Sequence, residues 1–168
     1  HKFDTMQLNK LTIQEYNEEH VAGHKKQLDF ISANVDNLQL LLKKLVAFQI
    51  AIPSWALGTG GTRFGRFAGA GEPRSLEEKI EDVGLLHALN QSGGAISLHI
   101  PWDIPSDANA IKLLATQHGL KFDAVNSNTF QDQPGQPVSY KFGSLQHVDP
   151  AVRRLAIDHN IEVIKQGE

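Results

Sequence analysis

The stretch FQIAIPSWALGTGGTRFGRF occupies residues 48–67. Its opening apolar run, FQIAI, predicts a buried strand. The proline that follows ends this strand, because proline has no backbone N–H to donate to a neighbour. Trp55 follows, and then a glycine-rich loop that carries Phe64 and two arginines. Glycines let a backbone approach a ligand closely, so the loop is a candidate binding site, and an ordinary surface loop is the alternative.

Length and composition indicate one globular domain. The chain has 168 residues, of which 40% are hydrophobic, and a net charge of −3, so it is long enough to bury a core. It lacks the basic balance that nucleic-acid binding needs, and it has no apolar run long enough to cross a bilayer. The absence of cysteine excludes disulfides and thiol catalysis and fits a cytoplasmic location.

The segment before the opening stretch predicts a helical extension. Apolar residues at helical spacing run through 8–46. Gly23 is expected to break the first helix, and Asn34 or Asp36 is expected to cap the last one. His20 and His24 lie one helical turn apart, a spacing that suits a metal, but no third ligand is near, so a solvated helix face is the preferred interpretation.

Strands and helices alternate in the rest of the chain, which predicts parallel βαβ units. The expected elements are a helix over 75–91 that a capping box opens and two glycines end, a strand over 95–100, a helix that Ser106 and Asp107 open and Gly119 ends, a strand over 120–125, and a final helix that Asp149-Pro150 opens. A doubly wound sheet and a (β/α)8 barrel both fit this order.

The residues that directly follow the predicted strands form the candidate site. Trp55 follows the first strand, His99 and Trp102 lie at the end of the second, and Phe130 follows the third. Parallel strands bind ligands at their carboxyl ends. His99 suits a general acid or base near neutral pH, and a packed core histidine is the alternative. The aromatic rings suit stacking on a sugar, although unplaced aromatic residues are more often core.

Three polar neighbours are open to two interpretations each. Asp103 suits either orienting His99 or capping the following turn, and Asn126 and Asn128 suit either sugar hydroxyls or an Asx turn. A nucleotide site is rejected, because the glycine-rich loop does not run directly into a helix. The spacing of residues therefore leads only to an α/β protein with a polar, aromatic site that suits a sugar.

Five segments resemble the bacterial L-rhamnose isomerases that also act on rare aldoses, a family of xylose-isomerase-like TIM barrels. They are IPSWALGTGGTRFGRF at 52–67, GEPRSLEEK at 71–79, SLHIPWD at 97–103, FDAVNSNTFQDQPGQ at 122–136 and SYKFGSLQHVDPAVRRLAIDHNIE at 139–162. The resemblance implies an α/β fold in which residues 47–168 form the first βα units, the N-terminal part of a TIM barrel, behind a helical extension of residues 1–46.

The resemblance also implies an aldose–ketose isomerase that interconverts L-rhamnose and L-rhamnulose. Such an enzyme uses a divalent metal, usually manganese, and is a cytoplasmic homotetramer. His99 is implied to contact the ring oxygen of the sugar and to assist ring opening. Trp55 and Trp102 are implied to line the pocket. Phe64 is expected over the site of an adjacent subunit, and Phe130 in an apolar wall that suits the methyl group of a 6-deoxy sugar.

The chain is much shorter than a complete barrel, which needs about 250 residues. The metal ligands and the groups that move hydrogen between C1 and C2 are therefore expected beyond residue 168. The isolated chain is expected neither to bind the metal pair tightly nor to isomerise sugar, and a hydride shift and an ene-diol both stay open. The alternatives are a non-catalytic half-barrel that binds sugar or pairs with another chain, and a sugar epimerase of the same fold.

Overall fold

A three-stranded parallel sheet forms the centre of the molecule. The computed structural model describes residues 10–57, 61–62, 65–66 and 69–168. Strands β1 (Ala51–Pro53), β4 (Ala95–Ile100) and β5 (Lys121–Ser127) pair in the order β1-β4-β5, and both pairings are parallel. Helices connect successive strands, so the α/β class and the parallel βαβ units are confirmed.

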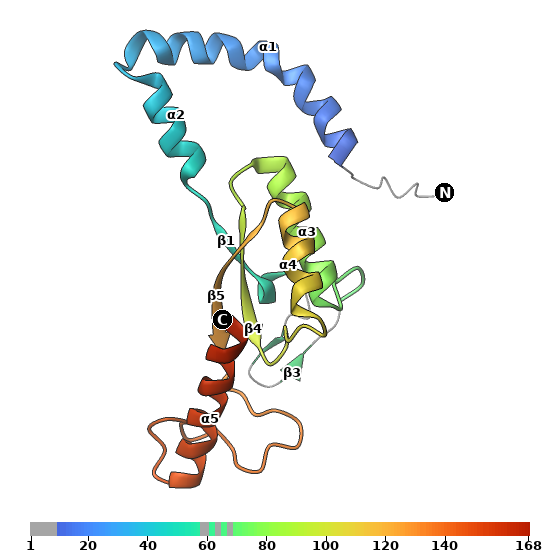
Figure 1. The fold of residues 1–168 in the computed structure, drawn as a ribbon, viewed down its shortest axis with the longest axis vertical. Helices are drawn as coiled ribbons and strands as arrows, with labels where there is room; N and C mark the ends of the chain where they lie inside the picture. Colours follow the sequence, from blue (N-terminus) through green and yellow to red (C-terminus); the bar gives the residue numbers. More distant parts are fainter. Residues whose placement is uncertain (1–9, 58–60, 63–64, 67–68) are drawn as a thin grey trace.

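The remaining elements flank this sheet. They are α1 (Lys10–Asn34), α2 (Leu38–Ala47), the 3-10 turn η1 (Ser54–Ala56), the two-stranded antiparallel ladder of β2 (Gly61–Thr62) and β3 (Gly65–Arg66), α3 (Leu76–Asn90), α4 (Ala108–Gln117) and α5 (Pro150–Gly167). Figure 1 shows α3 and α4 side by side along the sheet, while α1 and α2 reach away from it. None of the described helices has the combination of length and hydropathy that a bilayer span requires.

The main core lies between the sheet and the pair of helices α3 and α4. Leucine and isoleucine side chains from both helices pack on β4, where Ile96 is fully buried. The buried members of this core are Leu76, Ile80, Val83, Ile96, Ile111, Ala115 and Leu120. Because side chains alternate along a strand, the same packing leaves Ser97 and His99 on the opposite face of β4.

Helix starts follow the sequence closely because caps are local. The Ser75 hydroxyl accepts the N–H of Glu78 at 3.2 Å, while the Glu78 carboxylate accepts the N–H of Arg74. Asp107 and Asp149 cap α4 and α5 as expected. The end of α3 differs from the prediction: Asn90 is its last residue and Gln91 takes the left-handed conformation, with φ of 57°.

Three expectations about the first part of the chain are wrong. Helix α1 runs without a break through Gly23, because an exposed helix interior tolerates glycine at a cost of about 1 kcal/mol. The cap of α2 is Asn37, whose side chain accepts the N–H of Leu40 at 2.9 Å. The first strand is shorter than predicted, and Phe48 is 68% exposed. The strand ends at Pro53 as predicted, and Pro53 is itself part of it, since an edge strand tolerates proline.

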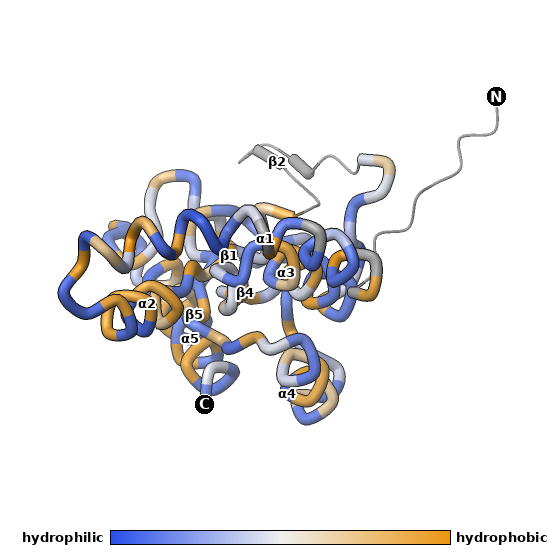
Figure 2. The backbone as a smooth tube through the Cα atoms, turned by 90° about the horizontal axis from the view of Figure 1, so that it is seen from above, coloured by the Kyte–Doolittle hydropathy of each residue, from blue (hydrophilic) through white to orange (hydrophobic). Residues whose placement is uncertain are grey.

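Helix α2 is apolar but poorly covered. It buries none of its residues, and Figure 2 shows it coloured largely as hydrophobic while standing beside the body of the molecule. The start of α1 is better anchored, because Ile13 is only 4% exposed. The two helices are therefore attached to the body mainly through the start of α1 and through the link from α2 to β1.

Two glycines allow a matched test of helix packing. An added Cβ at Gly84 would lie 2.3 Å from Nδ1 of His118, whereas one at Gly23 would meet nothing within 4 Å. We expect Gly84→Ala to lower the free energy of unfolding by about 1–3 kcal/mol, because α3 and α4 must separate. Gly23→Ala should instead raise helix content, since alanine favours a helix by about 1 kcal/mol over glycine. Circular dichroism and urea titration measure both effects, and equal stabilities for the two variants would contradict the tight α3–α4 contact.

The loop between β5 and α5 is organised by one carboxylate. Asp132 accepts the hydroxyl of Ser139 at 2.6 Å, the backbone N–H of Tyr140 at 2.7 Å and the side-chain amide of Gln136 at 3.3 Å. The hydrogen bond from Ser139, followed by that from Tyr140, lowers the pKa of Asp132 from its ordinary value. Tyr140 packs against Val152 of α5, so the carboxylate helps to seat this loop on the helix.

This arrangement makes the loop sensitive to acid. A carboxyl group with a lower pKa in the folded state stabilises the fold above its unfolded pKa, and that contribution is lost as pH falls through the folded pKa. We therefore expect Asp132→Asn to be less stable than the wild type at pH 7, with the difference disappearing in acid below the usual pKa of aspartate. Urea titrations at several pH values measure this, and a difference that persists in acid would show that Asp132 acts by another route.

Candidate functional site

Three aromatic rings surround one histidine at the carboxyl ends of the strands. The indole of Trp102 stacks on the imidazole of His99, with 4.2 Å between ring centroids and 29° between planes. Trp55, in η1 directly after β1, meets the imidazole edge-on at 5.4 Å, and Phe130, after β5, does so at 5.8 Å. The structure thus brings together four of the five predicted site residues. The fifth, Phe64, lies outside the described residues.

The histidine is buried, while two of the rings around it are exposed to solvent. His99 is 2% exposed, whereas Trp55 is 40% and Phe130 61% exposed. The Nε2 atom of His99 is itself buried. A ligand that arrives from solvent therefore meets aromatic surface first, and it reaches the imidazole only after a covering group shifts.

A buried carboxylate ties together the segments that carry these rings. Asp103, which is 1% exposed, accepts the ammonium of Lys79 at 2.6 Å and the backbone N–H of His99 at 2.7 Å. Its second oxygen also accepts the hydroxyl of Ser54, which directly precedes Trp55. Asp103 therefore links α3, η1 and β4. The sequence predicted that Asp103 either orients His99 or caps the following turn. Asp103 does orient His99, but through its backbone N–H and not through its ring.

Sequence reasoning missed Lys79 and Ser54. Lys79 lies on the apolar stripe of its helix, next to Ile80 and between Leu76 and Val83, and it is only 5% exposed. A lysine on the buried face of a helix requires a charged partner, and this signal in the sequence could have identified Lys79. Ser54 carries no comparable signal, because serine is common in turns.

The polar side of the imidazole faces β5. The side-chain amide nitrogen of Asn126 lies 2.8 Å from Nδ1 of His99. Three residues earlier on the same strand, Asp123 accepts the hydroxyl of Ser97 at 3.2 Å. Residues three apart in a regular strand lie on opposite faces. A shift in the β4–β5 register between Ile96 and Leu98 allows both contacts on one face.

Asn128, the second predicted asparagine, forms a side-chain hydrogen bond within the loop after β5. Asn128 is 1% exposed, and its backbone N–H donates to the carbonyl of Ile100 at 3.1 Å. Its side-chain amide donates to the carbonyl of Gln131 at 3.4 Å. Asn128 thus shapes the chain after β5, whereas Asn126 contacts the imidazole.

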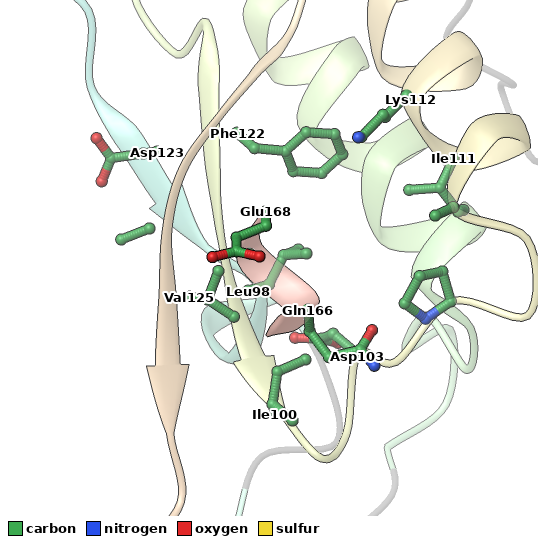
Figure 3. Close-up of a pocket in the computed structure, with 14 residues that line it drawn as sticks. Leu98, Ile100, Asp103, Ile111, Lys112, Phe122, Asp123, Val125, Gln166 and Glu168 are labelled. Atoms are coloured by element: carbon green, nitrogen blue, oxygen red, sulfur yellow. The ribbon is translucent and has the colours of Figure 1, made fainter. Parts of the chain in front are cut away.

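A separate cavity lies on the other face of the sheet. It has a volume of about 190 Å³ and is lined largely by apolar side chains of β4, β5 and α4 and by the end of α5. Figure 3 shows Leu98, Ile100 and Val125 pointing into it. Leu98 and Ile100 alternate with His99 along β4, so the cavity and the imidazole are on opposite faces.

The described residues offer no metal site. No group of three or more histidine, aspartate or glutamate side chains lies together within the described ranges. His20 and His24 are exposed on α1, in agreement with a solvated helix face. We therefore assign no reaction step to a metal held by these residues.

The chain is similar to proteins named as sugar isomerases. No protein-family model matches it. A probable sugar isomerase of Rhizobium meliloti is 54% identical over 125 residues, which cover 74% of this chain and 29% of that protein. A probable sugar isomerase of Mesorhizobium japonicum is 50% identical over 143 residues, which cover 85% of this chain and 32% of that protein. The chain therefore spans about a third of the length of these curated relatives.

Proposed function

We propose that this chain forms one wall of the sugar site in an aldose–ketose isomerase of the L-rhamnose isomerase type. The observation that carries the proposal is the imidazole of His99 packed against three aromatic rings at the carboxyl ends of parallel strands. Aromatic faces suit the apolar face of a pyranose and the methyl group of a 6-deoxy sugar. The similarity to two proteins named as sugar isomerases supports the same class.

In this proposal His99 acts at the ring oxygen of the cyclic sugar. Opening a pyranose breaks the bond between C1 and the ring oxygen and moves the proton of the anomeric hydroxyl to that oxygen. A histidine held beside the ring oxygen assists such a step. Because His99 is 2% exposed, the sugar must displace a covering group, and the aromatic rings then exclude water from the site.

The rest of the enzyme belongs to the proposal as well. We infer that β1, β4 and β5 are the first strands of a TIM barrel, because each pairs in parallel with the next along the chain. The groups that move hydrogen between C1 and C2, and the ligands of a divalent metal such as Mn²⁺, are assigned to the remainder of a protein of the relatives' length. A cytoplasmic homotetramer completes the proposal.

The first experiment uses the chain's own fluorescence. Its two tryptophans, Trp55 and Trp102, both contact His99, so all indole emission comes from the candidate site. Titration of the 168-residue chain with L-rhamnose should give a saturable change in emission. L-Mannose, which differs only by a hydroxyl at C6, should give a weaker one. Equal responses to the two sugars would show that the aromatic rings do not favour the methyl group at C6.

The second experiment tests the reaction. The full-length protein that carries this chain, supplied with Mn²⁺, should convert L-rhamnose to its 2-ketose, which chromatography separates from the substrate. Formation of an epimeric aldose instead would overturn the isomerase and favour an epimerase. Sugar binding without any product would favour the non-catalytic sugar-binding alternative.

A further inference from the structure

The contact between Asn126 and His99 bears on which ring nitrogen carries the proton. The amide nitrogen of Asn126 lies 2.8 Å from Nδ1 of His99, and an amide N–H can only donate. Nδ1 must then accept with its lone pair. In a neutral imidazole the proton therefore resides on Nε2.

The surroundings of His99 agree with a neutral partner on Nδ1. A histidine often donates Nδ1–H to a carboxylate, and that arrangement stabilises the charged ring. Here the nearby carboxylate of Asp103 is bound to Lys79, to Ser54 and to the backbone of His99. The side chain that contacts Nδ1 of the imidazole is the uncharged amide of Asn126.

The register of β4 and β5 places Asn126 opposite His99. Ile96 pairs with Phe122, and a ladder continued in that register would place Val125 opposite His99. The register shift after Ile96 instead places Asn126 there. One additional residue in β5 thus exchanges a valine for a hydrogen-bonding group, an effect typical of a β-bulge next to a site.

We propose that Asn126 is a positioning residue that holds His99 in the tautomer with the proton on Nε2. The imidazole then offers an N–H donor to the ring oxygen of the sugar. Such a hydrogen bond draws electron density from the bond between C1 and the ring oxygen while the proton of the anomeric hydroxyl moves to that oxygen. The purpose of the tautomer rests on the proposed function, but the tautomer itself is a property of the chain.

Nitrogen-15 NMR of the labelled 168-residue chain tests the tautomer directly. Long-range proton–nitrogen correlations distinguish the two neutral forms of a histidine, and His99→Gln identifies the signals of His99. The wild type should show the proton on Nε2. Asn126→Asp presents only acceptors, so Nδ1 should carry a proton in this variant, either in the neutral ring or in the charged ring that a carboxylate stabilises. The exposure of Asn126 favours folding of this variant.

A matched control and two outcomes make this test decisive. Asn109→Asp makes the same chemical change at the exposed start of α4 and should leave the pattern of His99 unchanged. A wild type with its proton on Nδ1 would show that the amide is reversed and would overturn the proposal. An unchanged tautomer in Asn126→Asp would also overturn it, because Asn126 would then not control the ring.

The catalytic purpose has a separate readout. In the full-length protein, Asn126→Asp should lower kcat for cyclic L-rhamnose by roughly 10-fold or more, with little change in KM. A wild-type kcat in this variant would overturn the role of the tautomer in ring opening. If the NMR result holds but the wild type turns over no sugar, the proposed function fails while the assignment of Asn126 stands.

Discussion

Replacing Asp103 by alanine is expected to lower the free energy of unfolding by about 3–5 kcal/mol, because the ammonium of Lys79 would stay buried without its counter-charge. The side chains of Lys79 and Asp103 are 6% and 0% exposed, and their charged atoms lie 2.6 Å apart. The same substitution removes the acceptor of the His99 N–H and of the Ser54 hydroxyl. Urea titration followed by circular dichroism measures the loss.

Two further variants separate the buried charge from general damage. Lys79→Met combined with Asp103→Leu should recover part of the stability, since removing both charges leaves no unpaired ion. Asp158→Asn breaks the exposed pair between Arg154 and Asp158 and should cost less than about 1 kcal/mol. An Asp103→Ala variant as stable as Asp158→Asn would show that Lys79 finds water, and the central role of Asp103 would be lost.

The second large effect concerns catalysis. In the full-length protein, His99→Gln should slow turnover of cyclic L-rhamnose by about 10²–10⁴-fold, the range of a lost acid–base group. An open-chain aldose analogue that cannot close into a ring should be turned over nearly as fast as by the wild type. Steady-state kcat/KM on both substrates measures the difference.

The control for this variant is His24→Gln, which changes an exposed histidine on α1 and should leave both rates unchanged. Equal losses on the cyclic and the open-chain substrate would mean that His99 only supports the packing of Trp102. In that case the imidazole is structural, and the proposal for ring opening falls.

Local signals in the sequence predicted local structure well. Ser75, Asp107 and the Asp149-Pro150 pair each begin a helix where expected, because a cap involves residues only two or three apart. The placement of Trp55, His99 and Trp102 just at strand ends was also visible, since it follows from the order of strands and loops.

Contacts between segments that are distant in the chain could not be predicted from the sequence. Lys79 and Asp103 are 24 positions apart, and Asn126 is 27 positions from His99. Their meeting depends on how α3 and β5 pack and on the shifted register of β5. No pattern in either segment alone encodes that register. The start of β1 was predicted three residues too early for a related reason. An apolar run indicates hydrophobic surface, but only pairing with a neighbouring strand makes it part of a sheet.

The loosely covered pair α1 and α2 has a consequence for how the chain withstands proteases. A segment with few buried side chains opens at small cost without global unfolding, and α2 buries none of its residues. Within the described part of these two helices, the exposed lysines at 25, 26, 43 and 44 are then sites where we expect trypsin to cut early. Cleavage there separates α1 and most of α2 from the rest of the chain. The sheet, the helices α3 and α4 and the aromatic side chains around His99 then stay together on one fragment.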